Sequence, residues 1–459
     1  MYDIAIIGLG IAGLEAALSA AKNGLKVIAF EKNEIGGSYL NFNSIPTKTI
    51  SYSSQLLKKI EKSSKLGINL FAKPGYNWQI MLDRKIEIVN KFSKLLNSEL
   101  NENITVVKAE AELFINYNEI EIYADDNIYQ AKNIIIATGF KLKELAGLPF
   151  DGEFVVKPED MFKKIDVPKR IAIVGSGSIG LEWAQILSDL GSEVKIIEIE
   201  KHLAFNYDIE LQKRVEKILK SNKVQIFKND HIVRVSNDQI FLKSGIAFDV
   251  DCILVTIGNE PNPCKISING CTEQFLIKPQ DDGSCDIDNL YLVGSAFCGS
   301  FASHEALFQA KNVINKILFN KEIENKISPY IINISPQIAT IGVKEQDVDL
   351  FDGYEIRKIS LSSLPEYWCD DSQDGMIKIV IKDETIVGAH IVSKNASLLI
   401  SMFSILINHK IKLDEIENMM FPLPSLAQGV LEVLKSEWKG YLSALGFLPL
   451  LAVFSILFS

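Results

Sequence analysis

Two glycine-rich turns in the sequence have the spacing of dinucleotide-binding loops. In each, an apolar strand precedes the glycines, a helix follows them, and an acidic residue ends the next strand, 18 residues after the third glycine (13 to 31 and 180 to 198). The residues are Gly8, Gly10, Gly13 and Glu31 in the first turn, and Gly175, Gly177, Gly180 and Glu198 in the second. Glycines let backbone amides approach a pyrophosphate at a helix N-terminus, and the acid accepts hydrogen bonds from a ribose. The repeated order predicts two dinucleotide sites.

The segment 36–48 reads GGSYLNFNSIPTK and stands shortly after the first site. It resembles the motif GGTCLNVGCIPSK of the FAD-dependent pyridine nucleotide–disulfide oxidoreductases, the dihydrolipoamide dehydrogenase group. The resemblance implies that Gly37 and Ser38 contact FAD. The two redox cysteines of the motif are Tyr39 and Ser44 in this chain. Because a hydroxyl cannot cycle between dithiol and disulfide, we expect a flavoenzyme scaffold without disulfide reductase activity.

Three further segments resemble the same family. They are the stretches Ile134–Gly139, Ile253–Gly258 and Leu290–Ser295. The resemblance assigns Thr138, Gly139, Gly294 and Ser295 to the FAD site and Gly258 to the NAD site. Ser295 stands where the family usually has an aspartate that binds the ribityl chain of the flavin. A serine hydroxyl can still make one such bond.

The resemblance also implies how the family's chemistry maps onto this chain. Hydride would pass from a reduced nicotinamide to FAD, with Lys48 beside the flavin and Glu182 paired with it as the catalytic residues. The family's partner subunit supplies a His–Glu pair in a motif like HxHPTxxE, and residues 421–428 read FPLPSLAQ here. Leu423 and Gln428 therefore replace the acid–base pair. Together with Tyr39 and Ser44, they make four degenerate redox positions.

Glu198 predicts which nicotinamide dinucleotide is used. A carboxylate suits the free 2′-hydroxyl of NAD and repels the 2′-phosphate of NADP. Lys201 and His202 follow it and would soften this preference, but no arginine pair replaces the acid. We expect FAD and NAD as cofactors, with NADH preferred over NADPH.

The fold class expected from these motifs is α/β, with two Rossmann-type dinucleotide-binding domains, an α+β dimerisation domain and an apolar C-terminal tail. The expected boundaries are 1–150 and 271–328 for a discontinuous FAD-binding domain, 151–270 for the NAD-binding domain, 329–439 for the dimerisation domain and 440–459 for the tail. A homodimer follows from the resemblance alone.

The amino-acid composition limits which kinds of partner and which cellular location are expected for this protein. The net charge of −10 disfavours nucleic acid, since no basic surplus is present to neutralise phosphates. The six cysteines form no CxxC and no zinc-type Cys/His cluster, so no metal site is expected.

Residues 440–459 carry no charge and are long enough to span a bilayer. They predict a cytoplasmic protein held at the cytoplasmic membrane face. A terminal helix docked on the protein itself or on its dimer partner is the alternative.

Three functions remain open at this point. The first is an NADH-dependent flavin oxidoreductase with a non-disulfide electron acceptor such as a quinone, suggested by the apolar Tyr39, Phe42, Phe421 and Leu423. The second is a transhydrogenase-like exchange of hydride between NADH and NADP. The third is a non-catalytic flavoprotein subunit, suggested by Ser295 and the four degenerate positions.

Overall fold

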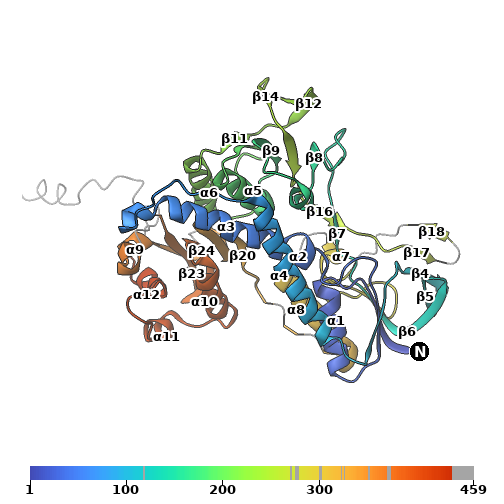
Figure 1. Cartoon of the computed structure of the whole chain (residues 1–459). Helices are drawn as coiled ribbons and strands as arrows, with labels where there is room; N and C mark the ends of the chain where they lie inside the picture. Colours follow the sequence, from blue (N-terminus) through green and yellow to red (C-terminus); the bar gives the residue numbers. More distant parts are fainter. Residues whose placement is uncertain are drawn as a thin grey trace, which may run out of the picture. The chain divides into compact units, whose positions relative to one another are not determined.

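The computed structural model forms two compact units (Figure 1). It describes residues 1–116, 119–268, 271–273, 279–298, 302–321, 323–324, 326–349, 352–369 and 374–436. The first unit comprises residues 1–199 and 223–325, and the second comprises residues 200–222 and the chain from 326 onward.

The first unit begins with a nine-stranded sheet in the order β18-β17-β4-β5-β6-β1-β2-β3, with β19 beside β6. Its strands are β1 (Tyr2–Ile7), β2 (Val27–Phe30), β3 (Ile104–Val107), β4 (Glu112–Asn116), β5 (Glu119–Ala124), β6 (Asn127–Ile136), β17 (Ile266–Ile268), β18 (Cys271–Glu273) and β19 (Leu290–Leu292). Strands β3, β2, β1, β6 and β19 are parallel. Helices α1 (Ile11–Lys22) and α8 (Ser303–Phe319) pack against each other beside this parallel part.

The central parallel strands β1 and β2 are buried on both faces, and β1 shows how this burial determines the sequence of such a strand. Ile4 and Ile6 enter one apolar core with residues of α1 and α8, whereas Ala5 and Ile7 enter a second core that includes Leu113. A strand covered on both faces needs apolar side chains at consecutive positions. The unbroken run of apolar residues in this strand follows from that burial.

A second sheet in the same unit is fully parallel, in the order β11-β10-β9-β15-β8. Its strands are β8 (Val155–Val156), β9 (Arg170–Val174), β10 (Glu193–Glu198), β11 (Gln225–Lys228) and β15 (Cys252–Val255). Helix α5 (Ser178–Asp189) follows β9, and an antiparallel meander is formed by β12 (Ile232–Ser236), β13 (Gln239–Leu242) and β14 (Ala247–Asp249). Both expected dinucleotide folds are therefore present.

The segment that resembles the redox motif forms two helices. Helix α2 (Gly37–Asn41) ends before Phe42, and α3 (Ser44–Glu61) begins two residues later. Neither Phe42 (φ −132°) nor Asn43 (φ −126°, ψ −91°) has helical backbone angles. Helix α3 packs against α4 (Trp78–Glu99) and against α5, the helix that follows β9 of the second sheet.

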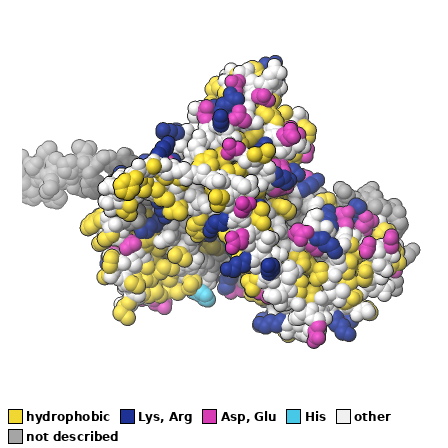
Figure 2. Space-filling model, in the orientation of Figure 1, with side chains coloured by type: hydrophobic (Ala, Val, Ile, Leu, Met, Phe, Trp, Pro, Cys, Tyr) yellow, Lys and Arg dark blue, Asp and Glu magenta, His cyan; other side chains and the backbone are white. Residues whose placement is uncertain are grey.

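The second unit is built on a five-stranded antiparallel sheet in the order β20-β21-β24-β23-β22. Its elements are β20 (Tyr330–Ile332), β21 (Gln337–Gly342), β22 (Glu355–Ser360), β23 (Met376–Lys382), β24 (Thr385–Ser393), α9 (Pro365–Cys369), α10 (Ala396–Asn408), α11 (Leu413–Glu417) and α12 (Gln428–Lys435). Residues of α10 and α12 fill an apolar core with alternate residues of β21, β23 and β24. Hydrophobic side chains gather on the visible surface of this unit (Figure 2). The exposed large hydrophobic residues of this unit include Leu398 and Ile405 of α10, Met420 and Leu423.

Helix α6 (Ile209–Ser221) lies in the NAD-binding part of the sequence, because it connects β10 to β11. In the structure, residues 200–222 belong to the second unit, and α6 contacts β24. The compact units therefore divide the chain differently from the domain boundaries expected from sequence.

Candidate functional site

The first glycine turn joins β1 to α1, and packing requires two of its three glycines. Gly8 has φ +98°, and a Cβ on it would lie 2.6 Å from the carbonyl oxygen of Ala137. A Cβ on Gly13 would lie 2.0 Å from the carbonyl oxygen of Gly8. Gly10 differs, since it has φ −65° and the nearest atom to its Cβ would be the Cα of Gly37 at 4.0 Å. Space therefore remains beside Gly10 at the start of α1.

The second glycine turn repeats this geometry between β9 and α5. Gly175 has φ +97°, and its Cβ would lie 2.6 Å from the carbonyl oxygen of Thr256. A Cβ on Gly180 would lie 2.5 Å from both the carbonyl oxygen of Gly175 and the hydroxyl of Thr256. Gly177 has φ −68°, and a Cβ on it would meet no atom within 4 Å. A pyrophosphate has room to approach at both second glycines.

The two acids are held next to these turns in the same way. The carboxylate of Glu31 accepts a hydrogen bond of 2.8 Å from the amide of Leu9, and that of Glu198 accepts one of 2.8 Å from the amide of Ser176. Each donor is the residue after the first glycine. The Ser176 hydroxyl also donates to Glu198 at 2.5 Å. Charge-assisted bonds fix both buried carboxylates at the end of the second strand.

The segment 36–48 lies against the first turn. The amide of Gly36 donates to the carbonyl oxygen of Leu9 at 2.8 Å, and a Cβ on Gly37 would lie 2.9 Å from the Cα of Gly10. Within this segment Ser38, Tyr39 and Ser44 are half-buried and Lys48 is exposed on α3. The predicted FAD contacts and the two degenerate redox positions therefore belong to one segment beside the first turn.

The loops after β6 and β15 are joined to each other. The Thr138 hydroxyl donates to the carbonyl oxygen of Asn262 at 2.7 Å, and the Asn262 amide group donates to the carbonyl oxygen of Thr138 at 3.1 Å. The short strands β7 (Phe140–Leu142) and β16 (Asn259–Pro261) pair directly beyond Gly139 and Gly258. This connection ties the end of the first dinucleotide fold to the end of the second.

Gly294 follows β19 and lies against α1. It has φ +65°, and a Cβ on it would lie 2.9 Å from the Cβ of Ala12. Its amide donates to the side chain of Gln309 at 2.6 Å. Ser295 begins α7 (Ser295–Cys298) directly after it and is half-buried. The strand that returns to the FAD site in the resemblance thus ends beside the first glycine turn.

The remaining predicted residues are distributed over both units. Glu182 is half-buried on α5, whose neighbour α3 carries Lys48, and the pairing of these two residues stays a prediction. Leu423 is 72% exposed in the second unit. Gln428 begins α12, where its side chain donates to Glu432 at 3.5 Å.

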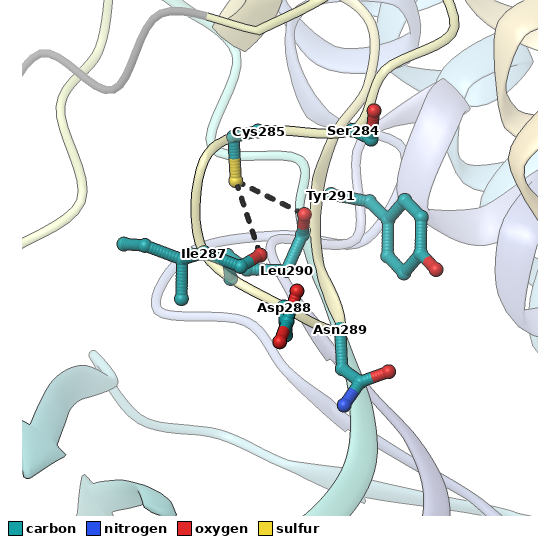
Figure 3. A pocket seen from close by; sticks show the side chains of 7 residues that line it. All are labelled: Ser284, Cys285, Ile287, Asp288, Asn289, Leu290 and Tyr291. Atoms are coloured by element: carbon teal, nitrogen blue, oxygen red, sulfur yellow. Dashed lines mark hydrogen bonds between the residues drawn. The ribbon is translucent and has the colours of Figure 1, made fainter. Parts of the chain in front are cut away.

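Of the described thiols, those of Cys252 and Cys264 are buried and that of Cys285 is half-buried, and burial raises the pKa values of all three. The pKa of Cys252 rises to about 11 and that of Cys264 to about 12. Burial also raises the pKa of Cys285, whose thiol turns back onto the carbonyl oxygens of Ile287 and Leu290, the latter at 3.0 Å (Figure 3). A surface hollow beside this thiol is lined by Ser284, Cys285, Ile287, Asp288, Asn289, Leu290 and Tyr291. A protonated, buried thiol is a poor nucleophile. Cys369 is exposed on α9 of the second unit.

Several buried polar groups were not predicted from the sequence. Within the described residues, the buried side-chain atoms without a hydrogen-bond partner are Oγ1 of Thr47 on α3 and Nε1 of Trp183 and Oδ2 of Asp189 on α5. A buried ion pair joins Asp208, before α6, to Lys378 on β23. The only signal for Lys378 in the sequence is its position between apolar residues in MIKIVIK, whose other lysine, Lys382, ends the segment.

A sequence profile of the pyridine nucleotide-disulphide oxidoreductases matches residues 2–313, and the profile of the dimerisation domain of that family matches residues 328–434. The chain belongs to this family. As an oxidoreductase family of flavoproteins, it implies the binding of FAD and NAD(P), and the open second glycines and fixed acids described above fit both dinucleotides. The matched dimerisation domain supports the homodimer expected from sequence.

Dihydrolipoyl dehydrogenases are among the most similar relatives. Those of Mycoplasma genitalium and Mycoplasma pneumoniae are 28% and 29% identical, over 96% and 95% of this chain and 100% and 98% of the relatives. Among solved structures, LpdA from Mycobacterium tuberculosis has a TM-score of 0.85 at 21% identity, over 95% of this chain and 99% of that one. The flavoprotein disulfide reductase RclA from Escherichia coli has a TM-score of 0.80 at 21% identity, with the same coverage. The expected α/β fold is confirmed.

In the described part of the chain, no helix is long and apolar enough to cross a membrane. The apolar tail, 440–459, lies outside the described residues. Membrane attachment through this tail therefore stays a prediction from sequence.

Proposed function

We propose that this protein is an NADH-dependent FAD oxidoreductase that passes electrons to an acceptor other than a disulfide. The observation that carries the proposal is the pair Tyr39 and Ser44, which stand on α2 and α3 where the family motif has its redox cysteines. Tyrosine and serine hydroxyls have no dithiol–disulfide couple. FAD, when bound, supplies a centre that accepts two electrons and releases them to a second substrate.

Three of the described cysteines offer no substitute for the missing pair. Cys252, Cys264 and Cys285 are held protonated at neutral pH by burial. Leu423 and Gln428 stand where the family has its acid–base pair, and neither side chain can exchange a proton at neutral pH. The disulfide half of the family's reaction therefore lacks both its electron carrier and its proton carrier.

The arrangement around Glu198 supports NADH as the electron donor. Its carboxylate is 6% exposed and is fixed by the amide and hydroxyl of Ser176. A fixed negative charge at this point binds a ribose hydroxyl and repels a 2′-phosphate. Lys48, exposed on α3, would place a positive charge near the flavin, where it favours electron density on the reduced ring.

The side chains at the degenerate positions suggest the class of acceptor. Tyr39 and its neighbour Phe42, which is 42% exposed, are aromatic. Aromatic and apolar side chains suit a planar acceptor such as a quinone rather than a charged thiol compound. We therefore propose a quinone or a similar planar electron carrier.

The test is anaerobic rapid mixing of the FAD-loaded protein with NADH and then NADPH, followed by turnover with lipoamide or with a water-soluble quinone. We expect NADH to bleach the flavin band without a thiolate–flavin charge-transfer band, and quinone to reoxidise it. The control is the double variant Tyr39→Phe/Ser44→Ala, which lacks both hydroxyls and should keep the quinone rate. Lipoamide turnover equal to quinone turnover would overturn the proposal. A bound flavin that NADH does not bleach would indicate a non-catalytic flavoprotein subunit instead.

A further inference from the structure

The connection between α3 and α4 presents large apolar side chains to solvent. It comprises the short 3₁₀ helix η1 (Ser63–Leu66) and the loop 67–77, both in the first unit (Figure 1). Within six consecutive residues, four such side chains are exposed: Leu66 by 61%, Ile68 by 57%, Leu70 by 46% and Phe71 completely. A local group of large apolar side chains in contact with solvent indicates an interaction surface.

Hydrogen bonds give this connection a defined shape at both ends. At its start, the Ser63 hydroxyl donates to the carbonyl oxygen of Ile68 at 3.3 Å, and the Ile68 amide donates to the carbonyl oxygen of Ser63 at 3.2 Å. At its end, the side chain of Asn77 caps α4 by accepting a helix amide at 3.0 Å. The buried Trp78 follows it and donates its indole N–H to the carbonyl oxygen of Lys164 at 3.0 Å. The apolar residues between these bonds therefore form a surface of defined shape.

Lysines flank this apolar group. The whole chain has a net charge of −10, yet residues 58–73 contain five lysines and one acidic residue, a local net charge of +4. Three of these lysines, Lys59, Lys65 and Lys73, are exposed and form no ion pair within the described part of the chain. The same short segment thus combines exposed apolar side chains with free positive charge in an otherwise acidic protein.

We propose that the α3–α4 surface, defined as residues 58–73, binds anionic lipid bilayers. The exposed lysines would pair with phosphate groups of the lipids, while Leu70 and Phe71 would enter the boundary between headgroups and acyl chains. The positive local charge of this surface complements the negative charge of such a bilayer. A second copy of the chain is a poorer occupant, because a two-fold contact would bring the same lysines of both copies together.

This inference goes beyond the proposed function and does not depend on it. Attachment through the α3–α4 surface would hold α3, which carries Lys48, next to the phase in which a quinone dissolves. The inference is also separate from the predicted attachment through residues 440–459. That tail carries no charge, so it has no electrostatic reason to distinguish anionic from zwitterionic lipids.

The test combines sedimentation of the FAD-loaded full chain with lipid vesicles and hydrogen exchange of residues 63–76. The vesicles contain phosphatidylcholine alone or phosphatidylcholine mixed with phosphatidylglycerol, which is anionic. We expect the mixed vesicles to bind the protein more tightly than the neutral ones, and added salt to reduce this difference. Binding to the mixed vesicles should also slow hydrogen exchange in residues 63–76.

Two variants separate the apolar and the charged parts of the surface. Leu70→Ser/Phe71→Ser removes the apolar tip, and Lys65→Glu/Lys73→Glu reverses two charges. Each should weaken binding to the mixed vesicles on the order of tenfold. The melting temperature should stay that of the wild type, because all four side chains are exposed.

Matched controls change exposed residues elsewhere in the first unit. Ile165→Ser replaces a side chain that is 95% exposed, and Lys169→Glu/Lys243→Glu reverses two exposed charges; both should bind vesicles as the wild type does. A wild type that does not prefer the mixed vesicles, or that binds them with unchanged exchange in residues 63–76, would overturn the inference. Slower exchange in these residues at higher protein concentration without vesicles would show that a second copy covers the surface instead. None of these measurements uses NADH or an electron acceptor, so their outcome is independent of the test of the proposed function.

Discussion

Replacing Asp189 by asparagine should stabilise the protein at alkaline pH. Asp189 ends α5, is 3% exposed, and its Oδ2 has no hydrogen-bond partner among the described residues. Burial raises its pKa from 3.8 to about 7, against the attraction of Lys58 on the neighbouring α3 and of Lys62 directly after that helix, and with repulsion from Glu61. The negative end of the α5 dipole acts in the same direction as burial.

The magnitude follows from the two pKa values. The carboxyl group of residue 189 loses its proton near pH 3.8 in the unfolded chain and near pH 7 in the folded chain. The free energy of unfolding therefore falls as pH rises between these two values, and it falls no further above pH 7. The total is about 4 kcal/mol. Asparagine has nearly the same shape and no charge to bury. Asp189→Asn should therefore gain about 4 kcal/mol at about pH 8.5 and less than half of that at about pH 5.

The assay is thermal unfolding of wild type and Asp189→Asn at these two pH values, with and without FAD. For a unit of this size we expect the melting temperature of the variant to exceed that of wild type by on the order of 5 °C at the higher pH. Asp126→Asn is the control for the loss of one negative charge, because Asp126 is exposed in a turn. A gain that is equal at both pH values, or absent at the higher one, would refute the reasoning.

Two further predictions concern the glycines and a buried histidine. Gly177→Ala should weaken NADH binding and leave the melting temperature unchanged, because a Cβ at this position meets no atom within 4 Å. Gly180→Ala should instead destabilise the protein by several kcal/mol, because its Cβ would collide with two atoms at 2.5 Å. Titration calorimetry measures the loss of NADH binding, and thermal unfolding measures the loss of stability. Burial lowers the pKa of His390 from 6.5 to about 4. Stability on the order of 3 kcal/mol should therefore be lost as pH falls from the unfolded value to the folded one. His390→Gln should weaken the dependence of the melting temperature on pH, whereas replacing the exposed His231 by glutamine should not. Equal slopes of melting temperature against pH in the wild type and both variants would contradict the lowered pKa of His390.

The sequence predicted the parts of the fold that depend on local order. Strand, glycine turn, helix, strand and acid lie within about 30 residues of one another, so their spacing carries the geometry. The fastening of α6 to the dimerisation sheet was not predicted, since Asp208 and Lys378 are 170 positions apart (208 to 378) and meet only in the folded chain. A lysine in an alternating strand reads as a solvent-facing residue. Asp189 likewise reads as an exposed helix end, whereas in the fold, where α3 packs on α5, it is buried.

The glycines of the two turns differ in how strongly they indicate dinucleotide binding. Gly8, Gly13, Gly175 and Gly180 cannot bear a side chain without collisions, so the fold alone explains them whether or not a dinucleotide binds. The open positions, Gly10 and Gly177, have backbone angles that other residues adopt readily. The fold gives no reason for glycine at these two positions, whereas the close approach of a pyrophosphate does. Tyr39 and Ser44, by contrast, are only half-buried, so packing places little restriction on what stands there. The turns thus favour dinucleotide binding, and in the proposed function the absence of thiols at positions 39 and 44 changes only the electron acceptor.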